Sequence, residues 1–309
     1  MTKPLPVIAA IPNYNMGHSL AILLPQVLRQ GYDAVYVLDD ASTDNSREIV
    51  ANFAPDVTWV GGKTNQGAGA NRNRVLQAHP AECIIHFLDA DVRLETNDVP
   101  AKARLAVAEP DTAFVGGLIK EAASGKPWIW NYGPYPMTLY SALSAQFQTL
   151  FGRLQAQRPW WRKLVRVLTQ RLRGEWPDIA VPPQRRAVYW MTEGNLLVRR
   201  SVLEWLGGFD ATVREADIIP PARRAYQAGL ISYFDPSIAV THLAIDVRHY
   251  GRAMALYKEE YGLMKQYGGW KEWLLPEGHF KPRHNCKNSY KNELDDRGGK
   301  PPKSLVAQP

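Results

Sequence analysis

Cys83-Ile84-Ile85-His86-Phe87-Leu88-Asp89-Ala90-Asp91 joins an apolar run to an acidic triplet in this 309-residue chain. Its first six residues are mostly apolar and include β-branched side chains, which predicts a strand buried on both faces of a sheet. If the extended backbone continues through the triplet, Asp89 and Asp91 point to the same side, because side chains alternate along a strand. A divalent cation, Mn²⁺ or Mg²⁺, would relieve the repulsion between two such carboxylates. The structural alternative is a turn with helix-capping aspartates.

Three further polar clusters, at 12–15, 39–44 and 61–67, each follow a short apolar run that predicts a strand. Helical segments alternate with these strands, and this alternation is typical of βαβ units with a mostly parallel sheet. Right-handed crossovers bring the carboxyl ends of parallel strands to one edge, where open α/β sheets bind ligands, so the clusters predict one common site. Strands are expected at 7–11, 34–38, 57–60 and 83–88, and helices at 18–30, 43–53 and 67–78.

Together these motifs resemble glycosyltransferase family 2, over about residues 5–245. The resemblance implies a GT-A fold: a Rossmann-like α/β domain with a mostly parallel central sheet flanked by helices, an acceptor-side insertion and a C-terminal helix. It also implies inverting transfer of a sugar from a nucleotide-diphosphate donor to a hydroxyl of a glycan or lipid-linked acceptor, in bacterial surface polysaccharide or glycolipid synthesis. The motifs that carry it are Pro12-Asn13-Tyr14-Asn15, Leu38-Asp39-Asp40-Ala41-Ser42-Thr43-Asp44, Asn65-Gln66-Gly67 with Arg72-Asn73, Asp89-Ala90-Asp91, Gly194-Asn195-Leu196-Leu197-Val198-Arg199-Arg200 and Gly207-Gly208-Phe209-Asp210.

On the donor side, the resemblance implies that Asp40 accepts a hydrogen bond from the nucleotide base and that Tyr14 stacks on that base. Exposed N–H groups where a helix begins after Asn65 attract phosphate. Arg72 either lies near that phosphate or forms a salt bridge within the domain. The predicted donor-binding residues are Pro12, Tyr14, Asn15, Asp40, Asn65, Gly67, Arg72, Asn73, Asp89 and Ala90.

Several polar residues near these motifs are predicted to be structural. Ser42 or Thr43 is a good N-cap residue for the following helix, and Asp44 would complement the dipole of its first turn. His86, inside the strand before the acidic triplet, is expected to serve packing.

The resemblance implies a metal site made of Asp89, Asp91 and His242, which would bind Mn²⁺ or Mg²⁺ and through it the donor diphosphate. His242 follows a short predicted strand at 238–241. A neutral imidazole can complete a manganese site beside carboxylates, whereas a lone histidine is more often structural.

Asp217 matches the catalytic base of the family when the chain is aligned on Arg223. The glutamate that commonly precedes this aspartate is replaced by Ala216, and Glu215 lies one position earlier. A general base contributes about 10²–10⁴-fold to the rate. The structural alternative is that Asp217 is only the N-cap residue of a helix whose first turn contains two prolines.

The acceptor pocket is expected to be bordered by residues of the second-half motif, namely Trp190, Glu193, Gly194 and Asn195. A basic segment at 151–176 has apolar residues at helical spacing, which is typical of a helix that lies on an anionic membrane surface. An ordinary amphipathic helix packed on the body is the alternative. Nucleic acid is not an expected partner, because no recognition motif accompanies the basic residues.

The composition is consistent with a cytoplasmic protein, peripheral on the cytoplasmic face of the membrane. The chain has a net charge of +7 and only two cysteines, which favours a reducing compartment. It offers no room for a signal peptide before the first strand, and no apolar stretch of the ~18–20 residues that a membrane span needs.

Five segments are predicted: a nucleotide-sugar-binding half at 1–117, an insertion at 118–187, a catalytic second half at 188–245, a C-terminal helical region at 246–280 and a mobile polar tail at 281–309.

Two other classes of function stay open at this point. A non-catalytic sugar-nucleotide or membrane-binding module would explain the alanine at position 216. A nucleotidyltransferase shares the α/β nucleotide fold, but it should carry a glycine-rich phosphate loop after its first strand. Here 12–15 offers no such loop.

Overall fold

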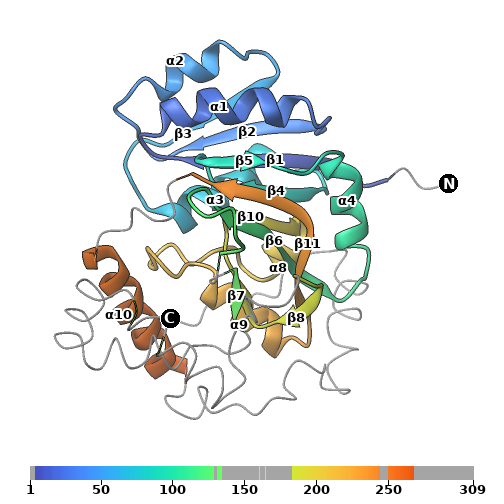
Figure 1. Ribbon diagram of the computed structural model, residues 1–309, viewed down its shortest axis with the longest axis vertical. Coiled ribbons are helices and arrows are strands. Elements are labelled where there is room, and N and C mark those ends of the chain that lie inside the picture. The colour runs from blue at the N-terminus through green and yellow to red at the C-terminus, as the bar shows by residue number, and fades with distance from the viewer. Residues whose placement is uncertain are drawn as a thin grey trace.

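The computed structural model describes residues 4–128, 131–133, 183–243 and 250–267, together with the single positions Trp160 and Leu164. Figure 1 shows a large sheet with helices on both faces, which confirms the predicted α/β class. The strands are β1 (Val7–Asn13), β2 (Ala34–Asp39), β3 (Val57–Gly61), β4 (Ile84–Leu88), β5 (Val92–Leu94), β6 (Thr112–Glu121), β7 (Tyr132–Gly133), β8 (Arg186–Val188), β9 (Trp190–Met191), β10 (Asn195–Arg199) and β11 (Ile231–His242). The helices are α1 (Gly17–Leu28), α2 (Ser46–Ala51), α3 (Ala68–Ala78), α4 (Val99–Ala106), α8 (Arg200–Trp205), α9 (Ile219–Gln227) and α10 (Tyr250–Tyr267).

Strand β1 shows why helices cover the sheet on both sides. Ile8 and Ala10 lie in an apolar cluster with residues of α3, α8 and α9, whereas Ala9 and Ile11 lie in another with residues of α1 and α2. All four side chains are fully buried. Because side chains alternate along a strand, a strand that is apolar on both faces needs a cover on each of them. Figure 1 shows α1 and α2 on one side of the sheet and α8 and α9 on the other.

The strands of the large sheet run in the order β3-β2-β1-β4-β10-β6-β11-β5, and β8 also pairs with β11. Strands β3, β2, β1 and β4 are parallel, so their carboxyl ends lie at one edge, as predicted. Strand β10 is antiparallel to both β4 and β6. Strands β6 and β11 are parallel to each other. The sheet is therefore mixed, with its parallel half at the amino-terminal side of the chain.

The acidic triplet turns the chain out of β4 and into β5. Strand β4 ends at Leu88, so the backbone does not stay extended through 89–91. The triplet does not cap a helix either, because the next element is the strand β5. Strand β5 pairs with the end of β11, and Val92 lies opposite His242. This pairing brings His242 close to the two aspartates.

The predicted boundary after residue 117 and the predicted start of α2 differ from the structure. Strand β6 runs through residues 117 and 118, so the boundary between the first half and the insertion falls inside a strand. Helix α2 begins at Ser46 with Asn45 as its N-cap residue, later than expected from Ser42 or Thr43. The reason is that Ser42 instead donates its hydroxyl hydrogen to Asp39, which fixes the turn after β2.

The predicted C-terminal helix is present as α10. In the described part of the chain, no helix combines the length and the apolar composition that crossing a bilayer requires. The predicted basic helix at 151–176, apart from Trp160 and Leu164, and the predicted tail at 281–309 lie outside the described residues.

His86 is a fully buried residue of β4 whose two ring nitrogens both have partners. Its Nδ1 is 2.7 Å from the hydroxyl of Tyr32, and its Nε2 is 2.8 Å from Oδ1 of Asn195. The amide nitrogen of Asn195 donates to the carbonyls of Leu118 and Ile238, so its oxygen accepts from His86 and Tyr32 donates to Nδ1. This arrangement fits a neutral ring. Burial lowers the pKa of His86 to about 4, and the hydrogen bond to Asn195 opposes the shift only in part.

The free energy of unfolding is expected to fall as the pH decreases from about 6.5 toward about 4, since the unfolded state binds a proton at His86 that the folded state excludes. The full loss from this residue is about 3 kcal/mol. Urea unfolding followed by tryptophan fluorescence between about pH 6.5 and 5, where ordinary carboxylates stay ionised, measures it. The variant His86→Gln should show a flatter pH dependence in this window. An unchanged slope in that variant would refute the assignment.

Candidate functional site

Asp89, Asp91 and His242 come together at the ends of β4 and β11. One ligand atom of each residue lies within 4.8 Å of the others. His242 Nε2 is 3.4 Å from Asp91 Oδ1 and 3.8 Å from Asp89 Oδ2, and all three side chains are partly exposed. Two carboxylates and one imidazole form a donor set that suits Mn²⁺ and accommodates Mg²⁺. The residues predicted to bind the cation therefore have both the geometry and the chemistry for it.

Arg72, in α3, connects this cluster to Asp217. Its Nη1 is 2.5 Å from Asp217 Oδ2, and its Nη2 is 3.2 Å from Asp89 Oδ1. Burial alone would lower the pKa of the guanidinium, but the carboxylates of Asp217, Asp89 and Glu193 outweigh burial and raise it. Of the two roles predicted for Arg72, the structure shows the salt bridge within the domain. Asp89 consequently directs one oxygen toward Arg72 and the other toward His242.

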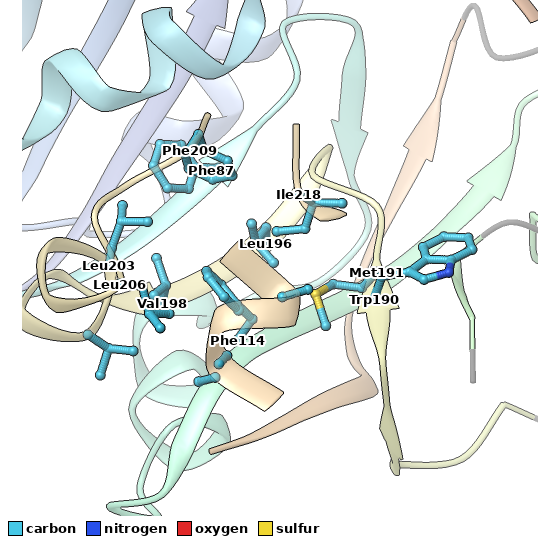
Figure 2. Packing of buried hydrophobic residues seen from close by; sticks show 14 of the residues in the cluster. Phe87, Phe114, Trp190, Met191, Leu196, Val198, Leu203, Leu206, Phe209 and Ile218 are labelled. Atoms are coloured by element: carbon cyan, nitrogen blue, oxygen red, sulfur yellow. The ribbon is translucent and has the colours of Figure 1, made fainter. Parts of the chain in front are cut away.

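Phe209, from the second-half motif, supports Arg72 by packing. The guanidinium carbon of Arg72 lies 5.7 Å from the centroid of the Phe209 ring. Phe209 also meets Phe87 edge-on, with centroids 5.4 Å apart, and Figure 2 shows these two rings together at one end of the cluster. Asn73 holds the backbone of Phe209, because its amide donates to the carbonyl and accepts from the N–H, both at 2.8 Å. The side chain of Asn73 is thus engaged by this motif, which corrects its predicted contact with the donor.

Asp217 is 2% exposed and lies beside Glu193, which is partly buried in the turn between β9 and β10. Ile218, and not Asp217, is the N-cap residue of α9, and the two prolines stand in the first turn as predicted. Burial raises the pKa of Glu193 well above its ordinary value, and the charge of Asp217 raises it further. The side chains of Glu193 and Asp217 also share a hydrogen bond. Glu193 also accepts from the N–H of Ile218 at 3.2 Å.

Gly194 lies directly against Asp89. Its carbonyl accepts from the N–H of Asp89 at 3.2 Å. A Cβ at this position would lie only 2.6 Å from Asp89 Oδ2, the oxygen that faces His242. Glycine at 194 therefore leaves the space in which this carboxylate can complete the cluster.

The substitution Gly194→Ala is expected to weaken Mn²⁺ binding by about 10–100-fold, because the new methyl group displaces the Asp89 carboxylate. Isothermal titration of the full chain with Mn²⁺ measures the change. Gly262→Ala is the matched control, since a Cβ at that position meets nothing within 4 Å. Equal Mn²⁺ affinity in the Gly194→Ala variant and the wild type would contradict the proposed place of the cation.

Asp40 is buried and holds the loop that begins α3. Its carboxylate accepts from the N–H groups of Gln66 at 3.0 Å and Gly67 at 2.8 Å. Arg74 adds an ion pair at 3.2 Å. Gly67, with a φ of 92°, is the N-cap residue of α3, as the sequence indicated. The predicted contact of Asp40 with a nucleotide base stays a prediction, since both oxygens contact the protein in this structure.

The remaining donor-side residues lie around the end of β1 and the loop before α3. Tyr14 is 48% exposed, so its ring is accessible for the predicted stacking. Asn15 has a φ of 55°, and its Oδ1 accepts from the N–H of Thr43 at 2.7 Å, which ties the first two polar motifs together. Pro12 lies opposite Leu38 in the pairing of β1 and β2. Asn65 is exposed and Ala90 is buried.

On the acceptor side, the structure separates the four predicted residues. Glu193 and Gly194 lie beside Asp217 and Asp89 as described above. Trp190 is 9% exposed and points to the opposite side of β9 from Met191 (Figure 2), with Gly133 against its ring. Asn195 is fully buried between β4 and β6, so its predicted place at the border of the acceptor pocket is wrong. The reason is that its amide links His86 to two backbone carbonyls in the core.

Sequence reasoning missed residues that position the site from other elements. Arg74 pairs with Asp40, and it bonds Asn71 at 2.8 Å. The spacing of Asn71 and Arg74, three residues apart on a predicted helix, was the available signal that they share a face. Glu259, in α10, accepts from the backbone that precedes Asp217. No local pattern in the sequence indicates this contact.

Comparisons with known proteins agree with this geometry. The chain matches glycosyl transferase family 2 over residues 8–172. An N-acetylglucosaminyl-diphospho-decaprenol L-rhamnosyltransferase of Mycobacterium tuberculosis is 26% identical over 262 residues, which cover 78% of this chain and 76% of the relative.

Solved structures share the fold. The mannosyltransferase PcManGT from Pyrobaculum calidifontis, in complex with GDP-Man and Mn²⁺, has a TM-score of 0.58 and 18% identity, over 99% of this chain and 79% of that chain. GalNAc-T7, with UDP, GalNAc and Mn²⁺, has a TM-score of 0.55 and 14% identity, over 96% of this chain and 56% of that chain. Because the family match covers more than half of its length, the chain belongs to glycosyl transferase family 2 and is a glycosyltransferase with the GT-A fold.

Proposed function

We propose that the protein is a metal-dependent, inverting glycosyltransferase that moves a sugar from a nucleotide-diphosphate donor to a hydroxyl of a glycan or lipid-linked acceptor. The observation that carries this proposal is the convergence of Asp89, Asp91 and His242, with Asp217 joined to them through Arg72. A cation site and a carboxylate base lie within one connected network of charges.

The cation site would bind the diphosphate of the donor. Asp89, Asp91 and His242 would hold Mn²⁺ or Mg²⁺, and Arg72 keeps Asp89 turned so that its Oδ2 faces His242. When bound, such a cation neutralises the charge that builds on the departing nucleotide diphosphate. The mannosyltransferase of similar fold, solved with GDP-Man and Mn²⁺, supports this assignment.

The carboxylate base acts on the acceptor. Inverting transfer needs a carboxylate that removes the proton of the acceptor hydroxyl as this oxygen attacks the sugar carbon. Asp217 is that carboxylate, and its ion pair with Arg72 fixes the position of the side chain. Since Asp217 is almost fully buried and Glu193 only partly, the acceptor hydroxyl would approach from the side of Glu193.

A lipid-linked acceptor is the more specific part of the proposal. The relative from Mycobacterium tuberculosis is named for rhamnosyl transfer to N-acetylglucosaminyl-diphospho-decaprenol, a lipid-linked sugar. By analogy, this protein would act on a related acceptor in bacterial surface polysaccharide or glycolipid synthesis. It would then work at the cytoplasmic face of a membrane, with the basic segment 151–176 as the predicted contact to anionic lipid.

A thermal-shift screen with UDP-, GDP-, dTDP- and CDP-sugars, each with and without Mn²⁺, tests the proposal. A ligand that binds only the folded state raises its stability by mass action. We expect one nucleotide class to raise the midpoint of unfolding in the presence of Mn²⁺ and to lose this effect with a chelator. Stabilisation that is equal with and without the cation would contradict a metal-dependent donor site.

A binding module without catalysis is the second candidate, because Ala216 replaces the glutamate that commonly precedes the base. Incubation with the nucleotide sugar found in the screen and a lipid-linked or glycan acceptor separates the two. Release of the nucleotide diphosphate that depends on the acceptor supports the transferase. Tight donor binding without release over a range of acceptors supports the module.

A further inference from the structure

We propose that Glu259 of α10 is a positioning residue that fixes the backbone immediately before Asp217. The inference rests on the proposed function, because it takes its purpose from Asp217 as the base. Glu259 itself does not reach the reacting atoms in this proposal. It acts through the loop at 214–216.

The contact is made by three consecutive backbone N–H groups. Arg214 donates to Oε1 of Glu259 at 2.8 Å, while Glu215 and Ala216 donate to Oε2 at 2.7 Å and 2.8 Å. Successive N–H groups that converge in this way form a concave binding place for an anion. Bonds to an ionised acceptor are about twice as strong as bonds between neutral groups. The carboxylate of Glu259 therefore holds this loop with both of its oxygens.

The held segment ends one residue before the base. Asp217 follows Ala216 directly, and its carboxylate is fixed by Arg72 at 2.5 Å. Gly69 leaves room for Asp217 from a third direction, since a Cβ there would lie 3.0 Å from the Cβ of Asp217. The main chain and the side chain of Asp217 are thus held by different elements, the main chain by α10 and the side chain by α3.

Helix α10 packs against the loop at 214–216, so the contact of Glu259 with this loop is part of the packing of the helix. Leu263, one turn after Glu259, is 7% exposed and belongs to the same apolar cluster as Val213, Ala216 and Ile218. Residues four apart lie on one helix face, so Glu259 and Leu263 face the loop together. Figure 1 shows α10 away from the large sheet, on the side of α8 and α9. The loop that carries the base therefore lies against a helix from outside the sheet.

Hydrogen exchange of the full chain, followed by mass spectrometry, tests the anchor without any substrate. In Glu259→Ala, we expect the amides of 214–216 to exchange at least about tenfold faster, because they lose a charged acceptor. In Glu259→Gln, which keeps an acceptor oxygen, the increase should be smaller. Lys258→Gln is the control, since it removes a charge from an exposed neighbour on the same helix and should leave the exchange unchanged.

Kinetics with the nucleotide sugar found in the screen give the second readout. A positioning role predicts that Glu259→Ala lowers kcat about tenfold or more, leaves KM for the donor unchanged and leaves Mn²⁺ affinity unchanged. Glu259→Gln should recover part of kcat. A uniform loss of folded protein without this split would indicate a merely structural role and would overturn the proposal.

The two proposals fail in different ways. Unchanged exchange at 214–216 in both Glu259 variants would refute the anchor, whatever the role of Asp217. Faster exchange and lower kcat in these variants, together with full activity of Asp217→Asn, would keep the anchor and remove Asp217 as the base. If Glu259→Ala does not fold, the exchange of Glu259→Gln decides the first question alone.

Discussion

Asp91→Asn is expected to remove the stabilisation of the protein by Mn²⁺ and to lower sugar transfer by at least about 100-fold. An amide in place of a carboxylate takes one of the two negative charges out of the cluster that faces His242. The ion pairs of Arg72 are with Asp89 and Asp217, so this substitution leaves the connecting network in place. Unfolding midpoints measured over a series of Mn²⁺ concentrations give the affinity.

Asp56→Asn is the matched control for this variant, because it makes the same chemical change at an exposed position just before β3. It should respond to Mn²⁺ like the wild type. An equal response in Asp91→Asn would place the cation elsewhere. Loss of transfer with an unchanged Mn²⁺ response would show that Asp91 serves the reaction in a different way.

Asp217→Asn is expected to lower kcat by about 10²–10⁴-fold, because the amide cannot take the proton of the acceptor hydroxyl. It should also lower the free energy of unfolding by about 1–3 kcal/mol, since the buried Arg72 loses one of its two ionised partners. Steady-state kinetics at a temperature where the variant stays folded separate the two effects. Urea unfolding measures the second.

Asp44→Asn is the control for the loss of stability. Asp44 accepts from the N–H groups of Gly17 at 2.9 Å and Ser46 at 3.0 Å, so its carboxylate holds the starts of α1 and α2. The variant should be less stable and yet transfer sugar at the wild-type rate per folded molecule. Wild-type kcat in Asp217→Asn would exclude Asp217 as the base.

The parallel half of the fold was predictable from short stretches of sequence. Each of its four strands is an apolar run followed by polar residues, and a helical segment separates each strand from the next, so βαβ units were the simplest arrangement. The helix start at Gly67 was also predictable, because glycine is common where the backbone takes a positive φ. In the structure, Gly67 has a positive φ and directly precedes α3. These features depend on neighbours within a few residues.

The metal cluster could not be predicted from any short stretch of the sequence. His242 reaches Asp91 because β5 pairs with the end of β11, which lies far away in the chain. From the residues alone, His242 was a lone histidine after a strand, and only the resemblance to the family suggested its role. The turn at 89–91 was hidden for the same reason, since the position of β5 decides where the chain must go.

The interior of the site was predicted least well. The spacing of the motifs placed Arg72 and Asn73 near the start of α3, but it did not show which way each side chain points. Arg72 turns to Asp89 and Asp217, while Asn73 turns to Phe209. The contact of Glu259 with the loop before Asp217 joins residues more than forty positions apart, and it depends on the packing of α10, which a pattern of helical spacing does not orient.

Electron–nuclear double resonance of Mn²⁺ bound to the full chain, with the nucleotide diphosphate of the donor added, tests whether His242 and the donor diphosphate bind the same ion. We expect a nitrogen coupling from the imidazole of His242, lost in His242→Ala, and a phosphorus coupling from the diphosphate on the same ion. Mn²⁺ that binds without the nitrogen coupling, or with no phosphorus nearby, would contradict a donor site built on Asp89, Asp91 and His242.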